Sequence, residues 1–311
     1  MIYGITGNTS KERLWSPVAE LIDWLRAHDL GYCLDADIAA GLADRDLPTY
    51  DPCAVQGTRE LSATSDVVLS FGGDGTLLRT AHDTGANDTP LLGVNIGRLG
   101  FLADTEVETI TQAIRRIEAD DFRVERRMVL EAEVEGHPNG AARWALNEFV
   151  IDRSGATGLI KIEVLVDGTP LNTYWADGLI VATPTGSTAY SLSTGGPIIT
   201  PGCDVVILTP IAPHTLTVRP IVLPSSSDIR MRVLENDHPY VFAADGRSTV
   251  FERQLNVTVR EAEHTVNLIK FPDQDYFKTL RSKLMWGATG HVDDDSADEM
   301  SPLTTSSSGN T

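Results

Sequence analysis

The segment that most constrains this fold is Gly72-Gly73-Asp74-Gly75-Thr76, which directly follows an apolar run and directly precedes a helical one. Residues 67–71 predict a buried strand, and residues 77–81 predict the start of a helix. Glycines at the carboxyl end of a strand let the backbone turn sharply and approach a phosphate, and the following helix offers unpaired N–H groups. We therefore expect a polyphosphate to bind at the edge of a parallel sheet.

The aspartate inside this loop needs an explanation, because a carboxylate repels the anion that the loop attracts. A carboxylate in such a place usually coordinates a divalent cation or acts as general base on an attacking hydroxyl. Asp74 is therefore a candidate catalytic residue. The structural alternative is a Gly-Asp-Gly turn closed by an Asx hydrogen bond.

The hydrophobic pattern changes once along the chain. Residues 2–104 alternate short apolar strands with helical patterns, which predicts an α/β domain with a largely parallel sheet over residues 1–122. Stretches such as 129–134 and 161–166 then alternate with period two, which predicts a mostly β domain over residues 123–271.

The end of the chain differs from both regions. Residues 272–287 predict a C-terminal helix that returns to the first domain. Residues 288–311 are rich in Asp, Ser and Thr, with too little apolar surface to offset the entropy of ordering, and predict a disordered acidic tail.

The charge of the chain restricts its partners. The formal net charge is −19 and the sequence pI is about 4.6, which argues against binding to nucleic acid or to an anionic membrane. Only five basic residues are lysines, at positions 11, 161, 270, 278 and 283, a combination that resembles proteins of extreme halophiles. An ordinary acidic protein is the alternative. No apolar run approaches the ~18–20 residues of a membrane span, and the N-terminus lacks the pattern of a signal peptide, so we expect a cytoplasmic protein.

The cysteines give no sign of a metal site. Cys33, Cys53 and Cys203 are widely spaced, with no Cys-x-x-Cys pair and no partnering histidine cluster. This spacing predicts neither a zinc site nor a disulfide framework.

Two further segments are suited to nucleotide binding. Asn147-Glu148 places an amide beside a carboxylate, which can together hydrogen-bond a ribose diol and a base edge, although exposed strand ends are often polar too. Residues 177–197 form a strand followed by a loop crowded with hydroxyl groups and small side chains, with Tyr190 offering an aromatic face to an adenine.

These segments together resemble the NAD kinase family. The loop at residues 72–76 is shared with lipid kinases and with relatives of phosphofructokinase, but residues 95–102 and above all 177–197 resemble the NAD kinase versions. Shorter matches lie at residues 213–216, 219–221, 245–246 and 275–287. The resemblance implies an α/β domain followed by a mostly β domain, as in NAD kinases and diacylglycerol kinases. It also implies transfer of a phosphoryl group from ATP or polyphosphate to the 2′-hydroxyl of the adenosine ribose of NAD.

The resemblance also implies roles for individual residues. The general base falls on Asp74. Contacts to the nucleotide fall on Gly75, Arg79, Asn147, Glu148, Asp177, Thr188, Ala189, Tyr190, Ser191, Leu192, Ser193, Ala212 and Arg247. Arg247 stands where many relatives carry Gln, and Trp175 stands where some carry a basic residue.

The family further implies a divalent cation, Mg²⁺, on the donor phosphates and a homodimer or homotetramer. No metal-ligating side-chain cluster is expected in the chain itself. Two alternatives remain at this point. One is a lipid kinase with the same loop, although the chain lacks an amphipathic basic segment for docking on a membrane. The other is a catalytically weak NAD or NADP sensor.

Overall fold

The structure is a computed structural model that describes residues 1–47, 55–97, 100–135, 144–153, 155, 158–234, 239–252 and 254–286. Residues Met1–Gln274 form one compact unit and Asp275–Thr311 a second. No helix within the described ranges has the length and apolar character that a membrane crossing needs.

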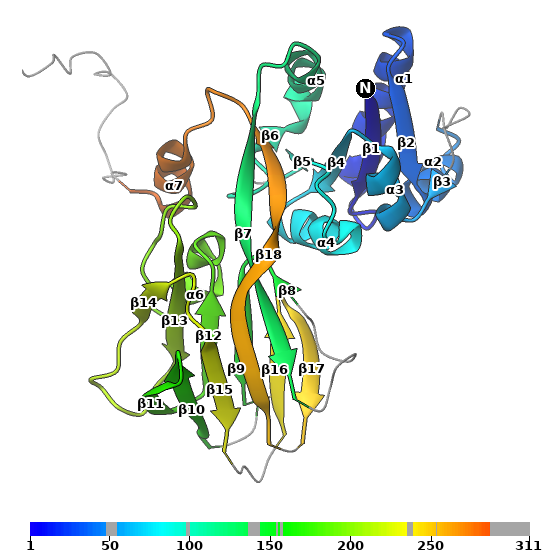
Figure 1. The fold of residues 1–311 in the computed structure, drawn as a ribbon. Helices are drawn as coiled ribbons and strands as arrows, with labels where there is room; N and C mark the ends of the chain where they lie inside the picture. The colour runs from blue at the N-terminus through cyan, green and yellow to red at the C-terminus, as the bar shows by residue number, and fades with distance from the viewer. Residues whose placement is uncertain are drawn as a thin grey trace, which may run out of the picture. The chain divides into compact units, whose positions relative to one another are not determined.

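The N-terminal part of the first unit alternates strands and helices, as its sequence pattern predicts (Figure 1). Its strands run parallel in the order β5-β4-β1-β2-β3. The strands are β1 (Ile2–Gly7), β2 (Gly31–Asp35), β3 (Val55–Gln56), β4 (Val67–Gly72), β5 (Leu91–Asn95) and β6 (Thr105–Glu106). The helices are α1 (Trp15–Ala27), α2 (Ala36–Ala43), α3 (Thr58–Thr64), α4 (Asp74–Thr84) and α5 (Ile110–Glu118), with 3-10 turns η1 (Glu12–Leu14) and η2 (Val107–Thr109).

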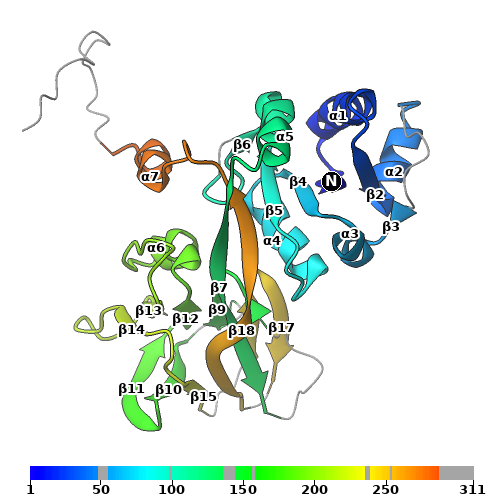
Figure 2. The same ribbon diagram turned by 45° about the horizontal axis from the view of Figure 1, so that its top comes forward.

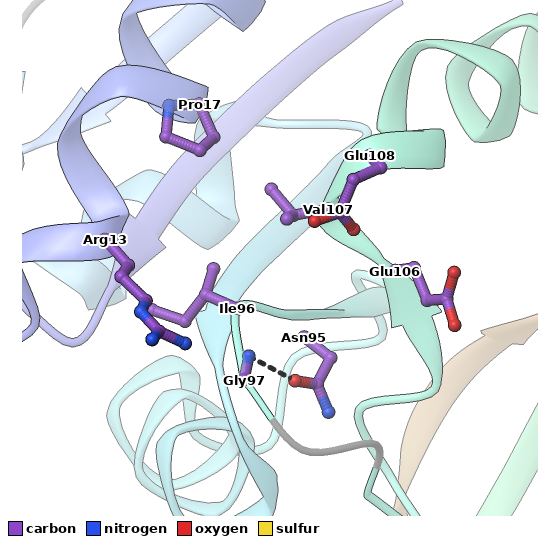
Figure 3. A pocket seen from close by; sticks show the side chains of 8 residues that line it. All are labelled: Arg13, Pro17, Asn95, Ile96, Gly97, Glu106, Val107 and Glu108. Atoms are coloured by element: carbon purple, nitrogen blue, oxygen red, sulfur yellow. Dashed lines mark hydrogen bonds between the residues drawn. The ribbon is translucent and has the colours of Figure 1, made fainter.

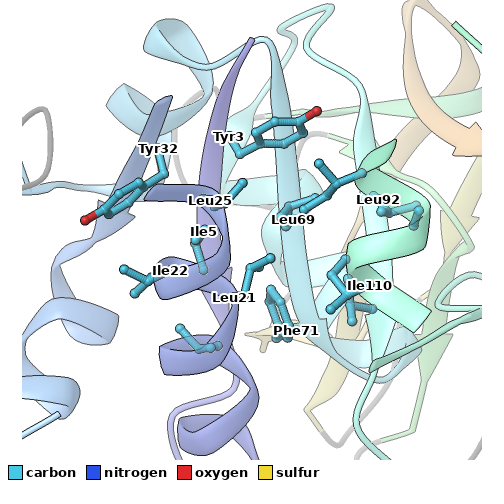
Figure 4. Close-up of a cluster of buried hydrophobic side chains, with 14 of the residues drawn as sticks. Tyr3, Ile5, Leu21, Ile22, Leu25, Tyr32, Leu69, Phe71, Leu92 and Ile110 are labelled. Atoms are coloured by element: carbon cyan, nitrogen blue, oxygen red, sulfur yellow. The ribbon is translucent and has the colours of Figure 1, made fainter. Parts of the chain in front are cut away.

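One hydrophobic cluster holds this part together (Figure 4). Helix α1 presents Leu21, Ile22 and Leu25 to Ile5 and Phe71 of the strands, and all five side chains are at most 1% exposed. The apolar residues of α1 recur at helical spacing, so burying that one face accounts for its position on the sheet.

The rest of the first unit is antiparallel. A six-stranded sheet has the order β14-β13-β12-β9-β16-β17. In the other sheet β11 pairs with β10, β10 with β15, and β15 with β18. The strands are β7 (Arg123–Val134), β8 (Trp144–Ala145), β9 (Glu148–Asp152), β10 (Ile160–Val166), β11 (Thr169–Ala176), β12 (Gly178–Ala182), β13 (Val205–Ile211), β14 (Ile221–Pro224), β15 (Ile229–Val233), β16 (Tyr240–Ala244), β17 (Arg247–Phe251) and β18 (Asn256–Lys270). Short helical segments η3 (Thr185–Thr188) and α6 (Tyr190–Ser193) follow β12.

Strand β18 connects the two kinds of sheet. It pairs antiparallel with β7 and β15, and at Leu268 it pairs parallel with Leu91 of β5, so that one 12-stranded sheet runs through both regions. The two views of Figures 1 and 2 agree that β7 and β18 run side by side. The sequence pattern predicts only a short strand at residues 255–259 here. The final five residues of β18 are all buried, and this loss of alternation hides the strand's continuation.

The predicted fold class is confirmed: a largely parallel α/β region is followed by a mostly antiparallel β region. The predicted boundaries at residues 122 and 271 stay predictions. The C-terminal helix is α7 (Tyr276–Leu284), capped by the Asp275 carboxylate, which accepts from the Phe277 N–H at 2.9 Å. Its return to the first domain also stays a prediction, and the tail at residues 288–311 lies outside the described residues.

The prediction about cysteines is wrong in one respect. Cys33 is fully buried and disulfide-bonded, whereas Cys203 is a free, exposed thiol. Spacing along the chain gave no sign of this bond.

Candidate functional site

The loop at residues 72–76 lies at the carboxyl edge of the parallel sheet, beside the carboxyl ends of β1 and β5. The strand order reverses between β1 and β4, since β2 and β3 extend the sheet on one side and β5 on the other. Ligands of open α/β sheets bind in the crevice at such a reversal. A cavity of about 350 Å³ lies there, and it is lined by Asn8, Lys11, Arg13, Gly72, Gly73, Asn95, Ile96 and Gly97.

Two features make this cavity suitable for phosphate. Lys11 and Arg13 supply positive charge to its wall. Helix α4 begins at its edge with Gly73 as the N-cap residue, so the N–H groups of the first turn face the same region. Neither basic residue was among the site residues predicted from the sequence. Their position just after the first strand was the available signal.

A second, larger cavity adjoins the first (Figure 3). It measures about 670 Å³ and shares Arg13, Asn95, Ile96 and Gly97 with the smaller one. Its remaining walls come from Pro17 of α1 and from Glu106, Val107 and Glu108. The two cavities together offer a cationic end and a mixed apolar and acidic end.

The carboxylate of Asp74 is held by three consecutive backbone N–H groups. Its Oδ2 accepts from Phe101 at 2.8 Å, and its Oδ1 accepts from Leu102 and Ala103, each at 3.0 Å. An ionised carboxylate offers about four lone-pair positions. Among the described residues, Oδ2 therefore keeps one acceptor position beyond the Phe101 bond, and the three donors fix where it points.

The segment that holds Asp74 is itself anchored at several points. Asn95 accepts from the Gly97 N–H at 2.6 Å and donates to the Ala103 carbonyl at 3.2 Å (Figure 3 draws the first bond). Lys270, at the end of β18, donates to the Leu102 carbonyl at 3.3 Å and to Asp104 at 2.7 Å. Burial raises the pKa of Asp104, and the Lys270 ammonium opposes that rise. A Cβ at Gly100 would collide with Oδ1 of Asp74, so this position requires glycine.

The predicted pair Asn147 and Glu148 is buried, each residue being 8% exposed. The Asp245 carboxylate accepts from three consecutive N–H groups here: Leu146 at 2.7 Å, Asn147 at 2.8 Å and Glu148 at 3.0 Å. On the other side, the Asn147 carbonyl accepts from the Thr183 N–H at 2.8 Å. A Cβ at Gly186 would collide with that same carbonyl, so η3 packs tightly on the pair.

Glu148 has a strongly perturbed carboxyl group. Burial raises the pKa of its carboxyl to about 8, the nearby Asp245 charge adds to the rise, and the Tyr190 N–H opposes it. Its Oε2 is buried and has no hydrogen-bond partner among the described residues. A buried acceptor without a partner is costly, and a ligand hydroxyl is the kind of group that would satisfy it.

The segment after β12 brings other predicted residues to Glu148. Tyr190 is 39% exposed, and its pKa is raised first by burial and then by the charges of Asp152, Asp177 and Glu148. Asp177 forms an ion pair with Arg153, at 2.9 Å between Nε and Oδ1. The Asp177 N–H donates to the Ile211 carbonyl at 2.9 Å, and the next residue, Ala212, has a φ of 43° that is unusual for a residue with a side chain and marks a constrained turn.

The other predicted residues differ in their burial and in their hydrogen bonds. Thr188, Ala189 and Leu192 are half-buried, and Gly75 and Ser193 are exposed. The Ser191 side chain is fully buried and hydrogen-bonds Thr209 at 2.9 Å, so it supports the loop from inside. Arg79 donates to the Gly7 carbonyl at 2.8 Å.

Arg247 and Trp175, which depart from the family pattern, each contact a side chain outside the predicted site residues. The Arg247 guanidinium contacts the His82 ring, a residue that the sequence analysis did not single out. The Lys161 ammonium lies 4.2 Å above the centre of the Trp175 ring. A positive charge is therefore present beside Trp175, although it comes from another strand.

The described residues contain no group of three or more His, Cys, Asp or Glu side chains able to hold a metal ion. They do not form a metal cage. Mg²⁺ usually keeps several waters and binds through one or two carboxylates and the substrate phosphates, so a dedicated cage is not required for it.

Comparison with known families and relatives agrees with this geometry. Residues 4–122 match the family described as ATP-NAD kinase N-terminal domain, and residues 146–271 match the ATP-NAD kinase C-terminal domain. An NAD kinase from Bacteroides fragilis is 38% identical over 300 residues, covering 94% of this chain and all of the relative. An NAD kinase from Gemmatimonas aurantiaca is 42% identical over 225 residues, covering 71% of this chain and 78% of the relative.

Solved structures share the fold. The yeast NADH kinase in complex with NADH superposes with a TM-score of 0.83 at 23% identity, covering 94% of this chain and 90% of that one. An NAD kinase from Archaeoglobus fulgidus in complex with ATP has a TM-score of 0.71 at 24% identity, covering 92% and 99%.

Proposed function

Because the chain belongs to the NAD kinase family and is a phosphotransferase, we propose that it phosphorylates the 2′-hydroxyl of the adenosine ribose of NAD to give NADP. Asp74 is the general base of this proposal. Both halves of the chain match the NAD kinase family, and this excludes the alternative that the protein is a lipid kinase.

The observation that carries the proposal is the state of the Asp74 carboxylate. It lies at the first residue of α4, beside a cationic cavity, with three N–H donors orienting it and one acceptor position left on Oδ2. A base must accept a hydrogen bond from the hydroxyl that it activates, and an oriented carboxylate with one open position meets that requirement.

The transfer itself needs few protein groups. As the 2′-oxygen attacks the terminal phosphorus of the donor, its proton passes to Asp74, and the bond from that phosphorus to the bridging oxygen of the donor breaks. Lys11, Arg13 and the first turn of α4 stabilise the negative charge of the donor phosphates. A divalent cation, when bound to those phosphates, would neutralise part of their charge.

NAD in this proposal lies along the residues that surround Tyr190. Glu148 and Asp177 accept from ribose hydroxyls, because carboxylates are the usual partners of such diols. Oε2 of Glu148, which is buried without a partner, is one position for such a bond. Asn147, Ala212 and the loop from Thr188 to Ser193 complete the proposed NAD site, with Gly75, Arg79 and Arg247 at its other end.

The donor is ATP, another nucleoside triphosphate or polyphosphate. The smaller cavity suits phosphate groups, which all of these donors share, and the larger cavity has room and apolar walls for a nucleoside. Filling the larger cavity by Pro17→Trp should therefore hinder ATP and spare polyphosphate, if both are substrates.

The first experiment is NADP formation from NAD with Mg²⁺, offering ATP and polyphosphate separately and assigning the phosphate position on the product. Formation of the 2′-phosphate supports the proposal and identifies the donor. A folded protein that binds NAD but makes no NADP with either donor would be an NAD or NADP sensor instead.

Each assay is run in dilute buffer and in molar KCl. A formal charge of −19 repels itself less at high salt, where the Debye length is only ~3 Å. Equal stability and activity in both buffers would contradict the prediction of halophily. The cytoplasmic location and the homodimer or homotetramer also stay predictions.

A further inference from the structure

His82 lies on the helix that begins at the phosphate loop, two turns after Asp74, or ~12 Å along the helix axis. The transfer reaction described above gives it no role. Its side chain is 3% exposed, and its Nε2 lies 2.8 Å from Oδ2 of Asp245, whose side chain is fully buried. A histidine and an aspartate buried together in this way link α4 to the turn between β16 and β17.

Asp245 in turn holds the backbone of the predicted NAD-binding pair. Oδ1 accepts from the N–H groups of Asn147 and Glu148, and Oδ2 accepts from Leu146 and from His82. Each oxygen has two donors, so the four lone-pair positions of the carboxylate are filled. His82 supplies the only one of these four donors that comes from a side chain.

The His82 ring is fixed from three sides. Trp144 lies against it with 3.8 Å between ring centres, and the Arg247 guanidinium contacts Nδ1. Nε2 faces the Asp245 carboxylate, which accepts, so we assign a proton to Nε2, and the Arg247 guanidinium lies 3.1 Å from that nitrogen as well. The ring is therefore oriented for one task, donation to Asp245.

We infer that His82 is a positioning residue: through Asp245 it sets the place of Asn147 and Glu148 relative to the helix that starts at the phosphate loop. The inference rests on the proposed function, in which that pair binds NAD. Movement of α4 then moves the NAD-binding backbone with it, so the two substrate regions keep one geometry.

The test compares two amide variants that differ only in reach. His82→Gln places an amide nitrogen near the position of Nε2, where it can donate to Asp245, and its oxygen can accept from Arg247. His82→Asn places its amide nitrogen near Nδ1 and cannot reach Asp245. Thr80→Val is the control, because it removes a buried 2.8 Å hydrogen bond between α4 and Ser70 that does not involve residues 146–148.

The readouts are the Kd of NAD by calorimetry, KM for NAD and for the donor, and the thermal midpoint. We expect His82→Asn to raise the Kd and KM for NAD about tenfold, with the donor KM changed less than about twofold. His82→Gln should stay within about threefold of wild type. Thr80→Val should lower the thermal midpoint without changing the Kd of NAD.

Three results would overturn the inference: equal NAD affinity in the Asn and Gln variants, an equal loss of affinity in Thr80→Val, or a larger effect on the donor KM than on NAD. The calorimetric Kd separates this test from that of the proposed function. If wild type binds NAD but makes no NADP, the proposed function fails, while the order of the variants in Kd still tests His82.

Discussion

Asp74 and Asp245 are held in the same way but differ in what their carboxylates have left to offer. Each accepts hydrogen bonds from three consecutive backbone N–H groups, Phe101 to Ala103 in one case and Leu146 to Glu148 in the other. Asp245 is sealed from solvent and receives a fourth bond from His82. Asp74 is only partly buried, and no fourth donor contacts it among the described residues.

This difference of one hydrogen bond separates a structural carboxylate from one that can react. A carboxylate with all lone pairs occupied cannot accept a proton without losing a bond, whereas one with an open position can. Both carboxylates orient a backbone segment, but only the one at the phosphate loop directly follows residues that line a cavity, Gly72 and Gly73.

The largest expected effect is that of Asp74→Asn. The amide cannot take the proton of the 2′-hydroxyl, so kcat should fall by about 10²–10⁴-fold, the usual worth of a general base. The Kd of NAD should change little, because the hydrogen bond to the 2′-hydroxyl is only one of the many predicted contacts to NAD. Steady-state kinetics and calorimetry check this, and a kcat within tenfold of wild type would exclude Asp74 as the base.

Asp245→Asn should act on stability instead. An amide NH₂ placed at either oxygen position faces backbone or imidazole donors, and the Asp245 side chain is fully buried, so the free energy of unfolding should fall by about 3 kcal/mol. Urea unfolding measures this change. If stability is unaffected and only kcat falls, the distinction between the two carboxylates is wrong.

Gly100→Ala tests the segment that holds Asp74. The added Cβ would collide with Oδ1 and displace the carboxylate, and small displacements of a catalytic group lower kcat by about 10- to 100-fold. Gly57→Ala is the matched control, because nothing lies within 4 Å of a Cβ at that exposed position. Equal activity of the two variants would show that the position of the Asp74 carboxylate does not matter for turnover.

The last expected effect concerns Glu148 and the pH dependence of stability. Its carboxyl pKa rises from 4.5 when free to about 8 in the fold, so between these values the native state keeps a proton that the unfolded state has lost. The contribution to stability is full below pH 4.5 and is lost as pH rises through about 8, by at most about 1.4 kcal/mol per pH unit. Urea unfolding of wild type and Glu148→Gln across this range should show the free energy of unfolding of wild type fall relative to that of the variant as pH rises, and a constant difference would contradict the shift.

The sequence was sufficient where the signal is local. The strand, loop and helix around Asp74 follow from contiguous residues. The link between His82 and Asp245 joins residues 163 positions apart, and the bond from Asn147 to Asp245 spans 98 positions. Such pairings depend on how sheets close, and neither periodicity nor residue type indicates them.

The resemblance to a family names candidate residues around Tyr190 but does not indicate the contacts of their side chains. The buried Ser191 hydroxyl hydrogen-bonds Thr209, and the Arg247 guanidinium contacts His82. Both contacts depend on neighbouring side chains that no motif specifies.

The pairing of Leu268 with Leu91 has a consequence for the order of synthesis. Strand β5, at the edge of the parallel sheet, pairs with β18 only after the ribosome has added Leu268, which is 177 residues beyond Leu91. Until then the nascent chain carries an open strand edge, which favours association with other chains. We therefore expect the N-terminal half, made alone, to aggregate, and the phosphate loop to reach its final geometry only when nearly the whole chain has emerged.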